Sequence, residues 1–233
     1  PEDGIKVVST DRGSRDRVLN ELKAALIKAV PEDFINAPVL LGDLAPAHST
    51  VVMIIPIDFE APKGRLIMPQ VQAIRELLDA HAKCLVVQQD RVAESIAELR
   101  HPPKLVMADS QVIMDVAAQT PEDIPLTTFS ILMARFKGDM IGLAEGAGAI
   151  QRLQPGDRVL ISEACSHHAL ADDIGRVKIP RWLRQFAGGN LEVDVKSGRD
   201  FPDDLSPYSL IIQCGGCTVT RRQMLARQYR AIR

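Results

Sequence analysis

Aromatic side chains are scarce in this chain of 233 residues, which has one Trp, two Tyr and six Phe. Its core must therefore be aliphatic, and a stacking platform for single-stranded nucleic acid is not expected. A large excess of one charge is also lacking, because 28 basic and 30 acidic residues leave a formal net charge of −2. A nearly neutral chain has no overall attraction for DNA, RNA or an acidic membrane surface. We therefore expect no nucleic-acid partner.

Long apolar runs are missing as well. The longest run covers residues 51–57 and is interrupted by Pro56, so no segment suits a membrane span and we expect no membrane partner. Four cysteines in a chain of this length do not make a secreted disulfide framework. We therefore expect a cytoplasmic protein, since in that reducing compartment clustered thiols more often serve metal or redox chemistry.

Short apolar runs alternate with helical periodicity through most of the chain, which predicts an α/β fold. The runs are continuous rather than alternating, as in parallel strands that are buried on both faces. A first unit has strands at 51–57, 84–87 and 104–108, followed by helices at 68–82, 92–100 and 111–118. A second unit has strands at 158–163, 191–196 and 210–213 and helices at 128–153, 180–186 and 220–233. The sequence therefore predicts two consecutive parallel-sheet α/β units, preceded by a small strand (5–10) and helix (18–29).

Two cysteine segments directly follow predicted strands of the second unit. The segment C-S-H-H at 165–168 follows strand 158–163, and the segment C-G-G-C at 214–217 follows strand 210–213. Loops at the carboxyl ends of parallel strands share one edge of the sheet, where ligands bind. Three thiolates, from Cys165, Cys214 and Cys217, could therefore meet the imidazole of His167 in one metal centre.

Local geometry favours these ligands over their neighbours. Two glycines let the backbone curl between the two C-G-G-C thiols, and the helix that follows lowers the pKa of a thiol at its start. His168 would point away from His167 in an extended segment, so it is the weaker candidate. Cys84 lies within an apolar strand and is expected to be a small buried hydrophobic residue.

The residues alone leave the identity of the metal open. A zinc site with three thiolates and one imidazole is one alternative, although zinc modules usually carry a pair of cysteines at both ends. Three thiolates are one short of the set that usually holds an iron–sulfur cluster. A 4Fe–4S cluster would then leave one iron for His167, an exchangeable ligand or a second metal unit. The remaining alternative is that the thiols are buried and unconnected.

The cysteine pattern resembles that of the HydF family, the GTPases that mature FeFe-hydrogenases. The family motif is C-x-H, a long spacer and then H-C-x-x-C, and here 46 residues separate His167 from Cys214. One position departs from the motif, because Gln213 replaces the His that precedes the second pair of cysteines. Further segments are similar to the same family, at 56–72, 123–132, 172–184 and 197–202.

The resemblance implies three parts. Residues 1–36 would be the C-terminal remnant of a GTPase domain, 37–119 a dimerisation domain, and 120–233 an iron–sulfur cluster-binding domain. No G-x-x-x-x-G-K-[ST] phosphate loop occurs in the sequence. GTP would therefore bind only in the missing part of the GTPase domain, and this fragment is expected not to be an enzyme.

The resemblance also implies a scaffold and carrier function. Cys165, Cys214 and Cys217 would bind a 4Fe–4S cluster, and His167 is the candidate for a further metal ligand. The cargo would be the di-iron subcluster precursor, made with radical-SAM maturases and delivered to apo FeFe-hydrogenase. We also expect a homodimer in which an exposed edge strand of segment 40–118 pairs across a two-fold axis. The alternative function is a structural zinc-binding α/β module with no role in cluster transfer.

Overall fold

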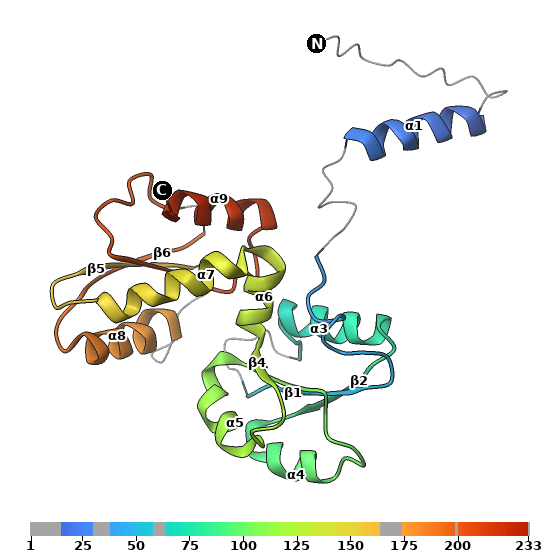
Figure 1. Cartoon of the computed structure of the whole chain (residues 1–233), viewed down its shortest axis with the longest axis horizontal. Coiled ribbons are helices and arrows are strands. Elements are labelled where there is room, and N and C mark those ends of the chain that lie inside the picture. Colours follow the sequence, from blue (N-terminus) through green and yellow to red (C-terminus); the bar gives the residue numbers. More distant parts are fainter. Residues whose placement is uncertain (1–14, 30–37, 58–63, 164–173, 199, 233) are drawn as a thin grey trace. The chain divides into compact units, whose positions relative to one another are not determined.

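The computed structural model describes residues 15–29, 38–57, 64–163, 174–198 and 200–232 (Figure 1). The chain divides into two compact units, Pro1–Pro38 and Val39–Arg233. In the first unit, the predicted helix is confirmed as α1 (Arg15–Ala29), whose apolar side chains Leu22 and Leu26 are exposed. The strand that we predicted at 5–10 lies outside the described residues.

The second unit begins with a four-stranded sheet in the order β2-β1-β3-β4, and every neighbouring pair is parallel. Each strand is short and is followed by a helix, as the alternating pattern predicts. The strands are β1 (Thr50–Ile54), β2 (Lys83–Val87), β3 (Leu105–Ala108) and β4 (Leu126–Thr128). The helices are α3 (Met68–Asp79), α4 (Val92–Ala97), α5 (Ile113–Gln119) and α6 (Phe129–Lys137), with 3-10 turns at Gln89–Arg91 and Ser110–Val112.

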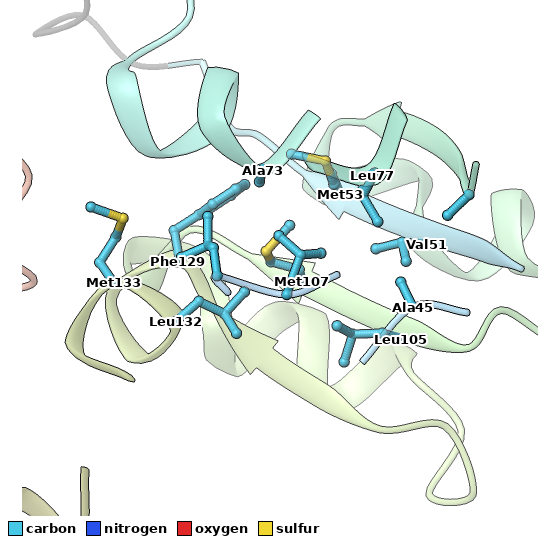
Figure 2. Packing of buried hydrophobic residues seen from close by; sticks show 13 residues of the cluster. Ala45, Val51, Met53, Ala73, Leu77, Leu105, Met107, Phe129, Leu132 and Met133 are labelled. Carbon is cyan, nitrogen blue, oxygen red and sulfur yellow. The ribbon is translucent and has the colours of Figure 1, made fainter. Parts of the chain in front are cut away.

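Burial on both faces explains why the strand sequences are continuously apolar. On β1, Val51 and Met53 join a core cluster with residues of α3 and α6, whereas Val52 and Ile54 join a second cluster with residues of α4 and α5. Successive strand side chains point to opposite faces of the sheet. Figure 2 shows the first cluster, in which Phe129 and Leu132 of α6 lie over the sheet beside Met107.

A second parallel sheet, in the order β6-β5-β7, follows along the chain. Its cluster of buried residues includes Val159, Leu183 and Leu210 and joins the sheet to the helices beside it. The strands are β5 (Arg158–Ser162), β6 (Glu192–Lys196) and β7 (Leu210–Gln213). The helices are α7 (Met140–Ala147), a 3-10 turn (Gly148–Arg152), a π-helical turn (Ile174–Lys178), α8 (Ile179–Ala187) and α9 (Arg221–Ile232). The predicted α/β class with two parallel sheets is confirmed.

The region that joins the sheets differs from the prediction. Strand β4 was not predicted, and it pairs with β3 in the register Val106↔Leu126, so the first sheet extends beyond our boundary at residue 119. The single helix predicted over 128–153 is instead α6, α7 and a 3-10 turn. The break falls at Gly138, where a Cβ would lie only 2.9 Å from the carbonyl oxygen of Ala134 and 2.8 Å from the Gln228 side chain.

None of the helices in the described ranges is long and apolar enough to cross a membrane.

Candidate metal centre

The carboxyl ends of β5 and β7 lie side by side, as the sequence predicts. The two strands are parallel, Ser162 is paired with Gln213, and the amide of Cys214 donates to the carbonyl of Ser162 at 3.0 Å. The C-G-G-C segment therefore leaves the sheet beside the strand that leads to Cys165. Cys165, His167 and His168 themselves lie outside the described residues, so the meeting of three sulfurs stays a prediction.

The segment 214–217, here called the CGGC loop, needs both of its glycines. Gly216 has φ +70°, a left-handed conformation that other residues adopt only with strain. Gly215 lies close to α6, since a Cβ placed on it would be 3.2 Å from the Cα of Ser130. Cys214 and Cys217 are both partly exposed at the ends of this curl. The glycines thus permit the tight backbone path that we predicted.

The buried ammonium group of Lys137 contacts the backbone of the CGGC loop. Nζ of Lys137, in the last turn of α6, donates to the carbonyl oxygens of Gly216 at 2.6 Å, Cys217 at 3.0 Å and Val219 at 2.9 Å. Only 8% of Lys137 is exposed. Burial lowers the pKa of Lys137, and the negative charge available on Cys217 and Cys214 opposes that shift. Sequence reasoning missed this residue because a lysine in the last helical turn usually indicates only a favourable helix dipole.

A second cation reaches the same edge from α9. The guanidinium of Arg227 donates to the hydroxyl of Ser162 at 3.2 Å and to the carbonyl of Gly198, and it lies 5.2 Å from the ring centre of Phe201. Burial lowers the pKa of Arg227, and the charge of Cys214 opposes this effect. Two positively charged side chains, from different helices, therefore flank the CGGC loop.

Gln213, which stands where the resembled motif has a histidine, joins the two strand ends. Its Nε2 donates to the carbonyl oxygens of Ser162 at 3.0 Å and Cys214 at 3.3 Å. The side chain therefore binds backbone at the edge of the sheet. At this position the chain thus has an amide that binds backbone where the resembled motif has an imidazole.

An ion pair between a buried carboxylate and a partly exposed guanidinium joins Glu163 to Arg176. The guanidinium of Arg176 binds Glu163 through two nitrogens, with Nη2 2.8 Å and Nε 3.0 Å from the carboxylate oxygens, and the Glu163 side chain is 5% exposed. Glu163 directly follows β5, and Arg176 belongs to the π-helical turn before α8. The ion pair thus holds the end of β5 to the turn before α8.

Cys84, His48 and His81 do not belong to the CGGC loop or to the strands beside it. Cys84 is half-buried and donates to the sulfur of Met53 at 2.9 Å, and burial raises its pKa to about 11, as expected for a thiol in an apolar strand. His48 and His81 both have positive φ angles and are joined through their backbones. Among the described residues, no group of three His, Cys, Asp or Glu side chains could hold a metal ion. The predicted centre includes Cys165 and His167, which lie outside the described residues, so it stays a prediction.

The chemistry of this edge suits an anionic, sulfur-bound metal group. Thiolates are soft ligands that select zinc, copper(I) or iron–sulfur clusters. Burying thiolates with a cluster concentrates negative charge, which the cations Lys137 and Arg227 would offset. The described residues thus supply two of the predicted thiols and a positively charged surrounding.

Comparison with known families gives two matches that together cover most of the second unit. The model of the hydrogen maturase F dimerization domain matches residues 40–138, and that of the hydrogen maturase F tetramerization domain matches residues 141–233. The junction between them falls where α6 ends and α7 begins. The first match contains the four-stranded sheet and Lys137, and the second contains the three-stranded sheet and the CGGC loop.

Comparisons with individual proteins add little. No curated protein matches the chain. Among solved structures, ornithine carbamoyltransferase from Pyrococcus furiosus is similar at 13% sequence identity and a TM-score of 0.31. That alignment covers 74% of this chain and 59% of the enzyme, so the chain spans less than two thirds of the enzyme's length.

Proposed function

Because the chain belongs to the hydrogen maturase F family and therefore takes part in hydrogenase maturation, we propose that it is a cluster-binding scaffold. In this proposal it holds a 4Fe–4S cluster and delivers a di-iron subcluster precursor to apo FeFe-hydrogenase. The observation that carries the proposal is the CGGC loop, which lies at the carboxyl edge beside the strand leading to Cys165. The two cations next to this loop support an anionic occupant.

Cys165, Cys214 and Cys217 would be the protein ligands. An iron–sulfur cluster held by three thiolates supplies one iron whose remaining ligand can exchange. His167, two residues after Cys165, is the candidate for a weak and displaceable ligand at that iron. An exchangeable position suits a scaffold, which must attach and release its di-iron cargo without losing its own ligands.

The proposed partners follow from this carrier role. Radical-SAM maturases would supply the di-iron precursor, and apo FeFe-hydrogenase would accept it. GTP would act through the family's GTPase domain, to which residues 1–36 would belong. In this proposal, the chain itself binds and presents metal groups and performs no catalysis.

Self-association belongs to both matched domains, as their descriptions state. We place the dimer contact at β2, an edge strand with which no other strand in the described ranges pairs on its outer side. Val86 on this strand is 43% exposed, which is unusual for an apolar residue of a parallel sheet. Pairing of two β2 strands across a two-fold axis would cover the edge. The second domain, where we expected cluster binding, would add the contacts of a tetramer.

Metal analysis of cysteine variants tests the proposed cluster. Wild-type protein reconstituted anaerobically with iron and sulfide should bind about four irons per chain. Each of the variants Cys165→Ser, Cys214→Ser and Cys217→Ser should lose most of this iron, because each removes one of three thiolates. Iron content and EPR spectra of the reduced samples measure the effect.

Cys84→Ser is the matched control, since Cys84 is a protonated thiol in the first sheet. It should bind as much iron as the wild type. Loss of the cluster in Cys84→Ser together with retention in Cys165→Ser would contradict the ligand assignment. Colourless protein that contains stoichiometric zinc would instead favour the structural zinc module.

A further inference from the structure

We propose that Lys137 is a positioning residue of the cluster site, through which helix α6 of the dimerization domain holds the CGGC loop of the second domain. In this view the ammonium group fixes the loop in the shape that presents its thiols, and it places a positive charge beside them. The role of that charge rests on the proposed function. The hold on the loop rests on the geometry alone.

The three hydrogen bonds use the full donor capacity of the side chain. An ammonium group has three donors, and here they meet the carbonyls of Gly216, Cys217 and Val219 at 2.6 to 3.0 Å. Carbonyls from three residues of one short segment can converge on one nitrogen only if the segment curls around it. Lys137 therefore defines the path of the CGGC loop, together with the left-handed Gly216.

Within the part of the chain that the structure describes, no carboxylate forms an ion pair with Lys137. Buried lysines are normally paired with an acid, because an isolated buried charge is costly. Among the described residues, the acidic side chains that form ion pairs bind arginines, and none binds Lys137. In the described ranges, the groups whose negative charge acts on Lys137 are the thiols of Cys217 and Cys214. A buried cation placed against two thiols is therefore suited to an anionic thiolate-bound group.

Helix α6 connects this ammonium group to the core of the dimerization domain. The helix starts at β4, where the hydroxyl of Thr128 accepts from the amide of Ile131 at 3.1 Å. Leu132 and Met133 are buried in the first core cluster (Figure 2), and Figure 1 shows α6 between β4 and α9. The carbonyl of Phe136 also accepts from Arg221 of α9 at 3.1 Å. A shift of α6 would therefore move the anchor of the CGGC loop.

Two substitutions distinguish the effect of the Lys137 hydrogen bonds on the loop from the effect of its positive charge. Lys137→Met keeps an unbranched side chain of similar length but removes the donors and the charge. Lys137→Arg keeps the charge, but a planar guanidinium cannot direct three donors from one nitrogen. Lys104→Met is the matched control. Lys104 is an exposed lysine directly before β3 of the first sheet, far along the chain from the CGGC loop.

Hydrogen exchange of the metal-free 233-residue chain tests whether Lys137 holds the loop. Amides of residues 214–219 should exchange roughly tenfold to a hundredfold faster in Lys137→Met, as loss of bonds from a charged donor predicts. The same amides should be faster than wild type in Lys137→Arg and unchanged in Lys104→Met. Equal exchange in wild type and Lys137→Arg would overturn the positioning role, even if Lys137→Met failed to fold.

The reduction potential of the reconstituted protein tests the charge. Reduction adds negative charge to the cluster, so loss of the nearby cation should shift the potential to a more negative value in Lys137→Met. Lys137→Arg should return the potential toward that of the wild type, which a purely structural role would not predict. Equal potentials in wild type and Lys137→Met would refute the electrostatic role. Failure of the wild type to bind iron would instead contradict the proposed function, and the exchange measurement would still decide whether Lys137 holds the loop.

Discussion

At the scale of single residues, the sequence offers candidate ligands but not the groups that surround them. Cysteines in C-x-H and C-x-x-C spacings after apolar strands are visible in the sequence, and the parallel pairing of β5 with β7 is confirmed. Lys137 could not be found in this way, because 76 residues separate it from Cys214 and the fold alone brings it to the CGGC loop. The pairing of Arg176 with Glu163 depends on the fold in the same way.

A prediction at this scale concerns Gly216. Gly216→Ala should destabilise the fold by roughly 1–2 kcal/mol, because its φ of +70° is strained for any residue with a Cβ. The added methyl group would also crowd the Met224 side chain. We therefore expect iron binding after reconstitution to fall as well. Thermal unfolding and iron content measure the two effects.

Gly188 provides the matched control. It has φ +71° after α8, and no atom lies within 4 Å of a Cβ placed on it. Gly188→Ala should therefore lose a similar amount of stability while binding iron like the wild type. If Gly188→Ala lost as much iron as Gly216→Ala, the effect would come from general destabilisation and not from the CGGC loop.

At the scale of elements, segments with a clear apolar or helical pattern can be predicted from the sequence. The short elements and breaks between them cannot. The strands β1, β2 and β3 and the helix α3 have continuous apolar runs or clear helical spacing, so their positions are confirmed within a few residues. Strand β4 has three residues after Pro125, too few for a pattern to be recognised. The break between α6 and α7 depends on the tight contact of Gly138 with Gln228, which no local pattern reveals.

The prediction at this scale concerns dimer formation through the edge strand β2. Val86→Lys should weaken dimer formation at least about tenfold, because a charge at a strand edge opposes pairing with another strand. Sedimentation or light scattering across a concentration series measures the change. Met114→Lys is the control, since Met114 is 78% exposed on α5 and its replacement should leave the dimer intact. A dimer of unchanged affinity in Val86→Lys would place the contact elsewhere.

At the scale of the whole molecule, association and metal binding are assigned to different sheets. The proposed dimer contact is at β2 in the first sheet, whereas the CGGC loop follows β7 in the second. The sequence predicts two separate sheets, but it does not predict that one helix, α6, packs in the core of the first sheet and holds the CGGC loop of the second.

Removal of the metal tests this division. Chelation of iron from the reconstituted protein should leave the dimer intact, because no predicted ligand lies on β2. Anaerobic light scattering before and after chelation measures the mass, and a change confined to a tetramer would agree with the second domain's association role. Dissociation of the dimer to monomers on chelation would show that the cluster supports the dimer contact directly.

The position of Lys137 also has a consequence for the order of assembly during synthesis. The dimerization domain leaves the ribosome before the second domain, and domains generally fold as units from the N-terminus. The ammonium anchor is therefore already in place on α6 when the CGGC loop emerges, and the loop can close around a finished support. A chain whose first domain has failed to fold would lack that support, so incorrectly folded molecules would be poor at capturing iron.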